Sequence, residues 1–163
     1  MIPKARAIAF SMTALCLLVV LTAIGTAAQT KQPNLSGTWK MNTEKSKFEQ
    51  GGPDGIIIKF DHKDSSLTES LNLTGGGGER TIETKYTTDG KETTQEVFGT
   101  SGQTSAKWEG DTLSIEWKIE GGSFTRKIKL SADGKTITMF VRQARPDGQS
   151  SEDTVVLEKQ EAK

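Results

Sequence analysis

Cysteine, histidine and tyrosine are almost absent from this sequence of 163 residues, which contains one of each. The single cysteine, Cys16, has no second cysteine with which to form an intramolecular disulfide. It also lies in an apolar N-terminal segment, so the chain beyond that segment has no thiol nucleophile and no cysteine-based metal site. We therefore expect neither a disulfide framework nor a metal ion in the folded part.

An excess of positive charge is also missing. The chain has 21 basic and 21 acidic residues, and without residues 1–28, which carry Lys4 and Arg6, the balance becomes 19 to 21. A nucleic-acid-binding domain needs a basic surface to neutralise phosphates, so nucleic acid is not an expected partner. The 135 residues that remain suffice for one domain with its own core, but not for two.

The first 28 residues have the pattern of a secretory signal peptide. Lys4 and Arg6 precede an apolar run over residues 7–24, and small residues follow up to Ala28. A charged start, an apolar core and a small-residue exit are the parts of a cleaved export signal. The alternative is an uncleaved anchor, because about 18 apolar residues can just cross a bilayer. We favour cleavage, which predicts a secreted or periplasmic protein with no stable membrane anchor.

The rest of the chain alternates short strand patterns with turn signals. Pairs such as Asp-Gly and Gly-Gly, which favour tight hairpins, recur about every 10 to 14 residues. Between them the apolar residues have a period of two, as in Leu113, Ile115 and Trp117. That period places one face of each strand in a core and the other in water. Only residues 43–49 fit a short helix.

These strands predict an all-β domain. After a linker at residues 29–34, we expect one domain over residues 35–160, folded as an up-and-down antiparallel β-barrel of about ten strands. A barrel is favoured because consecutive hairpins leave two exposed sheet edges unless the sheet closes on itself. A two-sheet sandwich is the alternative architecture.

Three polar side chains share the inward phase of this barrel. Glu69 lies between Leu67 and Leu71, Arg126 lies between apolar residues of a later strand, and Tyr86 follows two inward positions. A buried charge costs several kcal/mol unless it is paired or hydrated. Either Glu69 and Arg126 pair across the interior, or the barrel holds water or a ligand. A further alternative places Arg126 at the rim or on a bulged strand.

Catalytic chemistry has little support in the sequence. His62 is the only histidine, and its neighbour Asp61 points to the opposite face of the strand, so we interpret His62 as a solvated residue at a strand end. A Gly-x-Ser-x-Gly nucleophile elbow is absent. Residues 75–78 are four glycines, but strand residues follow them, which favours a hairpin over a phosphate loop. We predict a protein that is not an enzyme and has no cofactor.

The Gly37-Thr38-Trp39 triplet at the start of the first strand resembles the Gly-x-Trp opening of lipocalin-type, or calycin, barrels. In that family the tryptophan closes one end of the barrel, and an arginine from a late strand packs on it. The resemblance implies that Gly37 and Trp39 form a closed end with Arg142.

Three segments also resemble small exported bacterial proteins with lipocalin-like barrels and no settled function. They are LSGTWKMN with KSKF shortly after it (35–48), SADGKTIT (131–138) and VLEKQ (156–160). The sequence departs from typical lipocalins in having no disulfide and no long helix after the barrel.

We interpret the sequence as an exported, monomeric, non-catalytic binding protein for a small hydrophobic or amphipathic ligand. Arg126 is the expected polar anchor for a carboxylate, through a charge-assisted hydrogen bond. The other expected ligand-binding residues line the cavity with it: Glu69, Tyr86, Trp108 and Trp117. The alternative is a protein-interaction or envelope-stress module that uses the outer face of a solid barrel and has no small-molecule ligand.

Overall fold

The computed structural model describes residues 32–97 and 99–161. The expected signal peptide at residues 1–28, and with it Cys16, lies outside the described residues. Among the described residues, none forms a helix with the length and hydrophobicity needed to cross a bilayer.

The described chain forms ten β-strands and no helix, which confirms the all-β prediction. Their bounds are β1 (Gly37–Met41), β2 (Gly55–Lys63), β3 (Ser66–Gly75), β4 (Gly78–Thr87), β5 (Thr93–Val97), β6 (Thr100–Glu109), β7 (Thr112–Ile119), β8 (Gly122–Leu130), β9 (Thr136–Ala144) and β10 (Ser150–Lys159). The four glycines at 75–78 form the β3–β4 hairpin, as expected, with Gly75 paired to Gly78.

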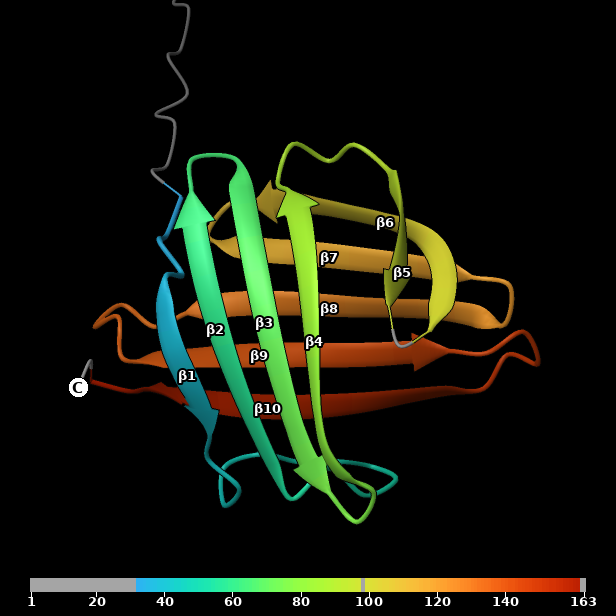
Figure 1. Cartoon of the computed structure of the whole chain (residues 1–163), viewed down its shortest axis with the longest axis horizontal. Coiled ribbons are helices and arrows are strands. Elements are labelled where there is room, and N and C mark those ends of the chain that lie inside the picture. The colour runs from blue at the N-terminus through green and yellow to red at the C-terminus, as the bar shows by residue number, and fades with distance from the viewer. Residues whose placement is uncertain (1–31, 98, 162–163) are drawn as a thin grey trace, which may run out of the picture.

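All ten strands belong to one antiparallel sheet, in the order β4-β3-β2-β1-β10-β9-β8-β7-β6-β5. The sheet curls so that β1 to β4 form a front layer, which crosses a back layer of β6 to β10 (Figure 1). The first and last strands pair, Trp39 with Lys159, which joins the layers on one side. The up-and-down barrel is confirmed, and because the sheet is continuous, the two-sheet sandwich is wrong.

The barrel is not fully closed, because the consecutive strands β4 and β5 are not hydrogen-bonded neighbours. Just after β4, Asp89 forms a bridge with Lys107 of β6, and Gly90 N donates to Ala106 O at 2.9 Å. The Gln95 side chain also donates to Lys85 O at 2.8 Å. These contacts lie at the C-terminal end of β4, so its N-terminal half borders an open seam.

The expected helix at residues 43–49 is absent. Asn42 does cap a turn, since its side-chain oxygen accepts from Lys45 N at 3.0 Å. The turn does not continue because Lys47 and Thr154 exchange two backbone hydrogen bonds, of 2.7 and 2.8 Å. Pairing with the sheet therefore outcompetes the local helix in this segment.

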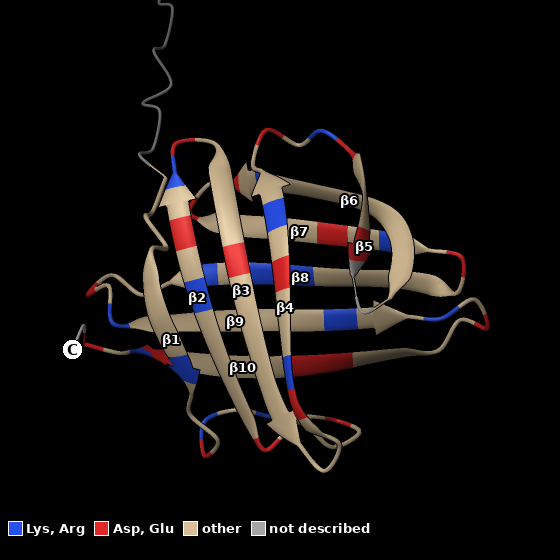
Figure 2. Cartoon of the chain, viewed as in Figure 1, with Lys and Arg blue, Asp and Glu red and all other residues tan. Residues whose placement is uncertain are grey.

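Charged residues of both signs lie on the outside of the strands. On β2, Lys59, Asp61 and Lys63 alternate with inward residues, and Figure 2 shows blue and red segments in turn along this strand. On β8, Lys127 and Lys129 alternate with buried Arg126 and Ile128 and are exposed.

One end of the barrel is sealed by Trp39, which is fully buried and donates from Nε1 to Leu35 O at 2.9 Å. The cation over its ring is Lys159, with Nζ 5.3 Å from the ring centroid. Gly37, at φ +136°, leaves room for the Lys159 side chain, whose Cε would lie 3.0 Å from an added Cβ. Glycine is favoured here by the positive φ, whereas the flexible end of Lys159 could move away from a Cβ.

Arg142 does not take part in this closed end, so its predicted packing on Trp39 is wrong. On β9 the inward positions are Met139 and Val141, both buried, and Arg142 therefore points outward. It is exposed and lies 3.8 Å from the Glu152 carboxylate, measured from Nε.

The β7–β8 hairpin provides a test of the backbone geometry. Gly122 has φ +137°, and an added Cβ would overlap the carbonyl oxygen of Ala144 on the neighbouring strand. Because that oxygen is backbone, it cannot move aside cheaply. Gly122→Ala should lower the free energy of unfolding by about 1–3 kcal/mol, measured by urea denaturation.

Gly121→Ala is the matched control, since nothing lies within 4 Å of its added Cβ. It should change stability by about 0.5 kcal/mol or less. Equal losses for the two variants would contradict the assigned hairpin geometry.

Candidate functional site

The inward-facing side chains change from buried to half-exposed at one level of the barrel. Along β3, Leu67 and Glu69 are buried, whereas Leu71 is half-exposed although it keeps the inward phase. Along β8, Arg126 is buried and Phe124 is half-exposed. The same change occurs on β4 between buried Thr84 and half-exposed Ile82, and on β7 between buried Ile115 and half-exposed Trp117. The interior therefore has a sealed part and a part that opens toward solvent.

We use the name vestibule for the half-exposed apolar side chains on the open side of this level. They are Leu71, Ile82, Trp117 and Phe124. Contiguous apolar side chains that remain in contact with solvent often line ligand-binding grooves or interaction surfaces.

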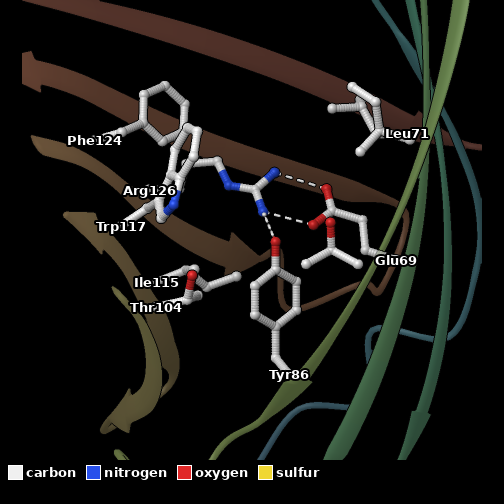
Figure 3. A pocket seen from close by; sticks show the side chains of 10 residues that line it. Glu69, Leu71, Tyr86, Thr104, Ile115, Trp117, Phe124 and Arg126 are labelled. Carbon is white, nitrogen blue, oxygen red and sulfur yellow. Dashed lines mark hydrogen bonds and ion pairs between the residues drawn. The ribbon is translucent and has the colours of Figure 1, made fainter. Parts of the chain in front are cut away.

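Three polar side chains form what we call the floor of the vestibule, at the level where burial becomes complete: Glu69, Tyr86 and Arg126. Arg126 donates from its two terminal nitrogens to the two Glu69 carboxylate oxygens, at 2.7 and 2.5 Å. It also donates to the Tyr86 hydroxyl oxygen at 3.1 Å (Figure 3). A bidentate arginine–carboxylate pair is the strongest geometry for such an interaction.

Strand phase and register explain how these residues meet. Glu69 is opposite Phe60 and Thr84 in the front layer, and Arg126 is opposite Ile115 and Val141 in the back layer. The pairing around both residues is regular, without a bulge, so the proposed bulge or rim position of Arg126 is wrong. Of the two possibilities left open by the sequence, pairing across the interior is the one observed.

Electrostatics keep Tyr86 and Arg126 each in one protonation state. Burial raises the pKa of Tyr86 to about 12, with the Arg126 cation opposing the rise and the Glu69 carboxylate adding to it. Burial disfavours the charged form of Arg126, but the Glu69 carboxylate outweighs burial, and the pKa of Arg126 lies above its ordinary value. Tyr86 is thus a neutral phenol and Arg126 a cation at any physiological pH.

A cavity of about 60 Å³ lies between the floor and the vestibule. It is mostly apolar, and its lining residues are Glu69, Leu71, Ile82, Thr84, Tyr86, Thr104, Ile115, Trp117, Phe124 and Arg126. Figure 3 shows Trp117 and Phe124 beside the Arg126 side chain. Thr104 is buried, and its Oγ1 has no hydrogen-bond partner among the described residues. A buried hydroxyl without a partner costs free energy, and a ligand with a polar group would satisfy it.

Four of the five predicted ligand-binding residues line this cavity: Glu69, Tyr86, Trp117 and Arg126. Trp108 does not. It shares the inward phase of Thr104 but lies four residues closer to the sealed end, where it stacks on His62 with ring centroids 5.8 Å apart.

His62 is buried, which corrects its interpretation as a solvated residue. It keeps the inward phase of Phe60, and the chain before β1 covers it: His62 Nδ1 accepts from Leu35 N at 3.4 Å. This contact joins residues 27 positions apart, so the local sequence carried no sign of it.

Six lining residues were not among the predicted ligand-binding residues: Leu71, Ile82, Thr84, Thr104, Ile115 and Phe124. Of these six, Thr104 is the one to which the strand pattern assigned no inward face. Strand β6 has few apolar residues, so its period gave no reason to assign an inward face at Thr104. Its pairing with Trp117 on β7 places it at the cavity. Among the described residues, no cluster of three or more histidine or acidic side chains is arranged to hold a metal ion.

No protein-family model matches this chain, and no curated protein matches it in sequence. Solved structures do match in fold. A secretory abundant heat soluble (SAHS) protein from Ramazzottius varieornatus has a TM-score of 0.63 at 10% identity, over 80% of this chain and 98% of that one. Human cRBP IV has a TM-score of 0.54 at 18% identity, over 78% and 99%.

A zebrafish ileal bile acid-binding protein, solved in complex with cholic acid, has a TM-score of 0.57 at 15% identity, over 77% of this chain and 98% of that one. The fold is a lipocalin-like barrel, which confirms the fold that the resemblance implied. Identities of 10–18% show the shared fold alone, so the ligand has to be argued from this chain's own side chains.

Tyr86 provides a direct test of the floor, because it is the only tyrosine in the chain. Its ultraviolet tyrosinate absorbance should titrate near pH 12 in the folded protein and near pH 10 in denaturant. Between these values the unfolded state has lost the proton and the folded state has kept it, so rising pH favours unfolding.

The contribution of Tyr86 to stability is therefore complete below pH 10 and lost by pH 12, a difference of about 3 kcal/mol. Tyr86→Phe should remove this part of the pH dependence of urea denaturation. A folded-state midpoint near pH 10 would contradict the buried position of the phenol.

Proposed function

We propose that this protein binds a small apolar or amphipathic molecule in the vestibule and makes or breaks no covalent bond. The observation that carries the proposal is the half-exposed apolar vestibule above a floor whose charges are already paired. Ligand sites of this kind are concave, mostly apolar and supplied with a few fixed polar groups.

The size of the cavity limits the ligand. A volume of about 60 Å³ is well below the roughly 150 Å³ of an engineered cavity that holds benzene. The ligand therefore extends from the enclosed space into the open end, past Phe124 and Trp117. Both side chains are only half-buried, so they can shift without opening the sealed core.

The comparisons agree with this proposal. Besides the cholic acid complex of the zebrafish protein, a structure described as a REP1-NXSQ fatty acid transporter matches with a TM-score of 0.58 at 13% identity. The interaction-module alternative has weaker support: the exposed large apolar residues in the described chain are Ile57 and Phe140, and isolated exposed apolar residues are ordinary on protein surfaces.

Two isoleucine variants test the site with octanol as probe. Ile82→Trp fills the vestibule and should weaken octanol binding at least about tenfold, measured by isothermal titration calorimetry. The matched control is Ile57→Trp, because Ile57 is exposed on the outer face of β2. It should bind like the wild type. Equal losses in both variants, or a wild type that binds neither octanol nor octanoate, would contradict the proposal and favour the interaction-module alternative.

We also propose that residues 1–28 direct export, so that the mature protein is secreted or periplasmic. The supporting pattern is Lys4 and Arg6 before the apolar run, and Thr26 and Ala28 at the small-residue positions. When the full-length sequence is expressed in a Gram-negative host, the protein should appear in the osmotic-shock fraction. Its intact mass should be that of a chain that starts at Gln29. Leu17→Arg, which interrupts the apolar run, should keep it inside the cell. Full-length protein in the membrane fraction would instead indicate an uncleaved anchor.

A further inference from the structure

We propose that Glu69 acts as a built-in substitute for a ligand carboxylate, so that the vestibule selects uncharged molecules carrying a hydroxyl group and rejects carboxylates. This inference rests on the proposed function and specifies its ligand class. It replaces the expectation that Arg126 anchors a fatty-acid-like carboxylate. The argument depends on how Arg126 is already bonded and on which polar group in the cavity still needs a partner.

Arg126 has no free bidentate face for a ligand. Its two terminal nitrogens donate to the two Glu69 oxygens, and one of them donates also to Tyr86. Both members of the pair are buried, with side-chain exposures of 9% for Arg126 and 2% for Glu69. A second carboxylate at this depth would be repelled by Glu69 and would lose its own hydration without gaining the cation.

Thr104, in contrast to Arg126, has a polar group that still lacks a hydrogen-bond partner among the described residues. This group is the side-chain Oγ1, which is buried in a residue that lines the same cavity. A hydroxyl can donate one hydrogen bond and accept others, so an alcohol can pair with Thr104 whichever way the threonine hydroxyl turns. The chain of such a molecule would then lie along Leu71, Ile82 and Phe124 toward the open end.

Octanol and octanoate provide a matched pair of probes, because they share a chain length and differ in the charge of the head group. At neutral pH the wild type should bind octanol at least about tenfold more tightly than octanoate, measured by calorimetry. Glu69→Gln removes the built-in carboxylate and frees Arg126, so octanoate should become the tighter ligand. The double variant Glu69→Gln/Arg126→Gln lacks the cation as well and should reject octanoate again.

Thr104→Val tests the hydroxyl contact. It should weaken octanol binding roughly fivefold, as expected for the loss of one buried hydrogen bond. Added to the Glu69→Gln variant, Thr104→Val should leave the affinity for octanoate unchanged. The matched control is Thr138→Val, because Thr138 is on the outward phase of β9. It should bind octanol like the wild type.

Circular dichroism shows whether each variant folds. If Glu69→Gln does not fold alone, octanoate should restore its spectrum and octanol should not, because the ligand carboxylate would replace the missing partner of Arg126. A Glu69→Gln variant that neither gains octanoate affinity nor is rescued by octanoate overturns the inference. A wild type that binds both probes equally overturns it too, while leaving ligand binding intact. A wild type that binds neither probe overturns the proposed function and the inference together.

Discussion

The ion pair between Glu69 and Arg126 joins the two layers of the barrel where the backbone does not. On the side of β1 and β10 the layers are connected by a main-chain ladder, but β4 and β5 are not hydrogen-bonded neighbours. A buried pair costs the hydration of both charges, and removing one partner leaves the other uncompensated. With Tyr86 completing the set, the pair holds β3 and β4 against β8 at a fixed separation.

The same pair divides the interior into two parts with different properties. On one side the core is sealed by residues such as Trp39 and Leu67, which are fully buried. On the other side the apolar side chains of the vestibule remain half-exposed. The proposed head-group selection would link stability to ligand choice, because it assigns both to the same two charges.

Strand periodicity predicted a large part of this arrangement. A period of two placed Glu69, Tyr86 and Arg126 on the inward face, and the regular register of the sheet preserves that phase. The errors have a common cause. Residues 43–49 lose their helix to pairing of Lys47 with Thr154, and His62 is covered by Leu35, so both depend on contacts between distant parts of the chain. The family resemblance misplaced Arg142, whose own strand phase points outward.

The sequence by itself determined the all-β class, the ten strands and the inward face of each strand that has a clear apolar period, because these follow from alternation and turn chemistry along a few neighbouring residues. Only the tertiary structure decided that Glu69 and Arg126 pair, that Lys159 rather than Arg142 covers Trp39, and that Thr104 lines the cavity. A period of two determines whether a side chain points inward or outward, but not how deep in the barrel it lies or which residue it contacts. The depth and the contact partner depend on how the sheet curls and where β4 and β5 separate. The curl and the separation result from many weak contacts between distant parts of the chain.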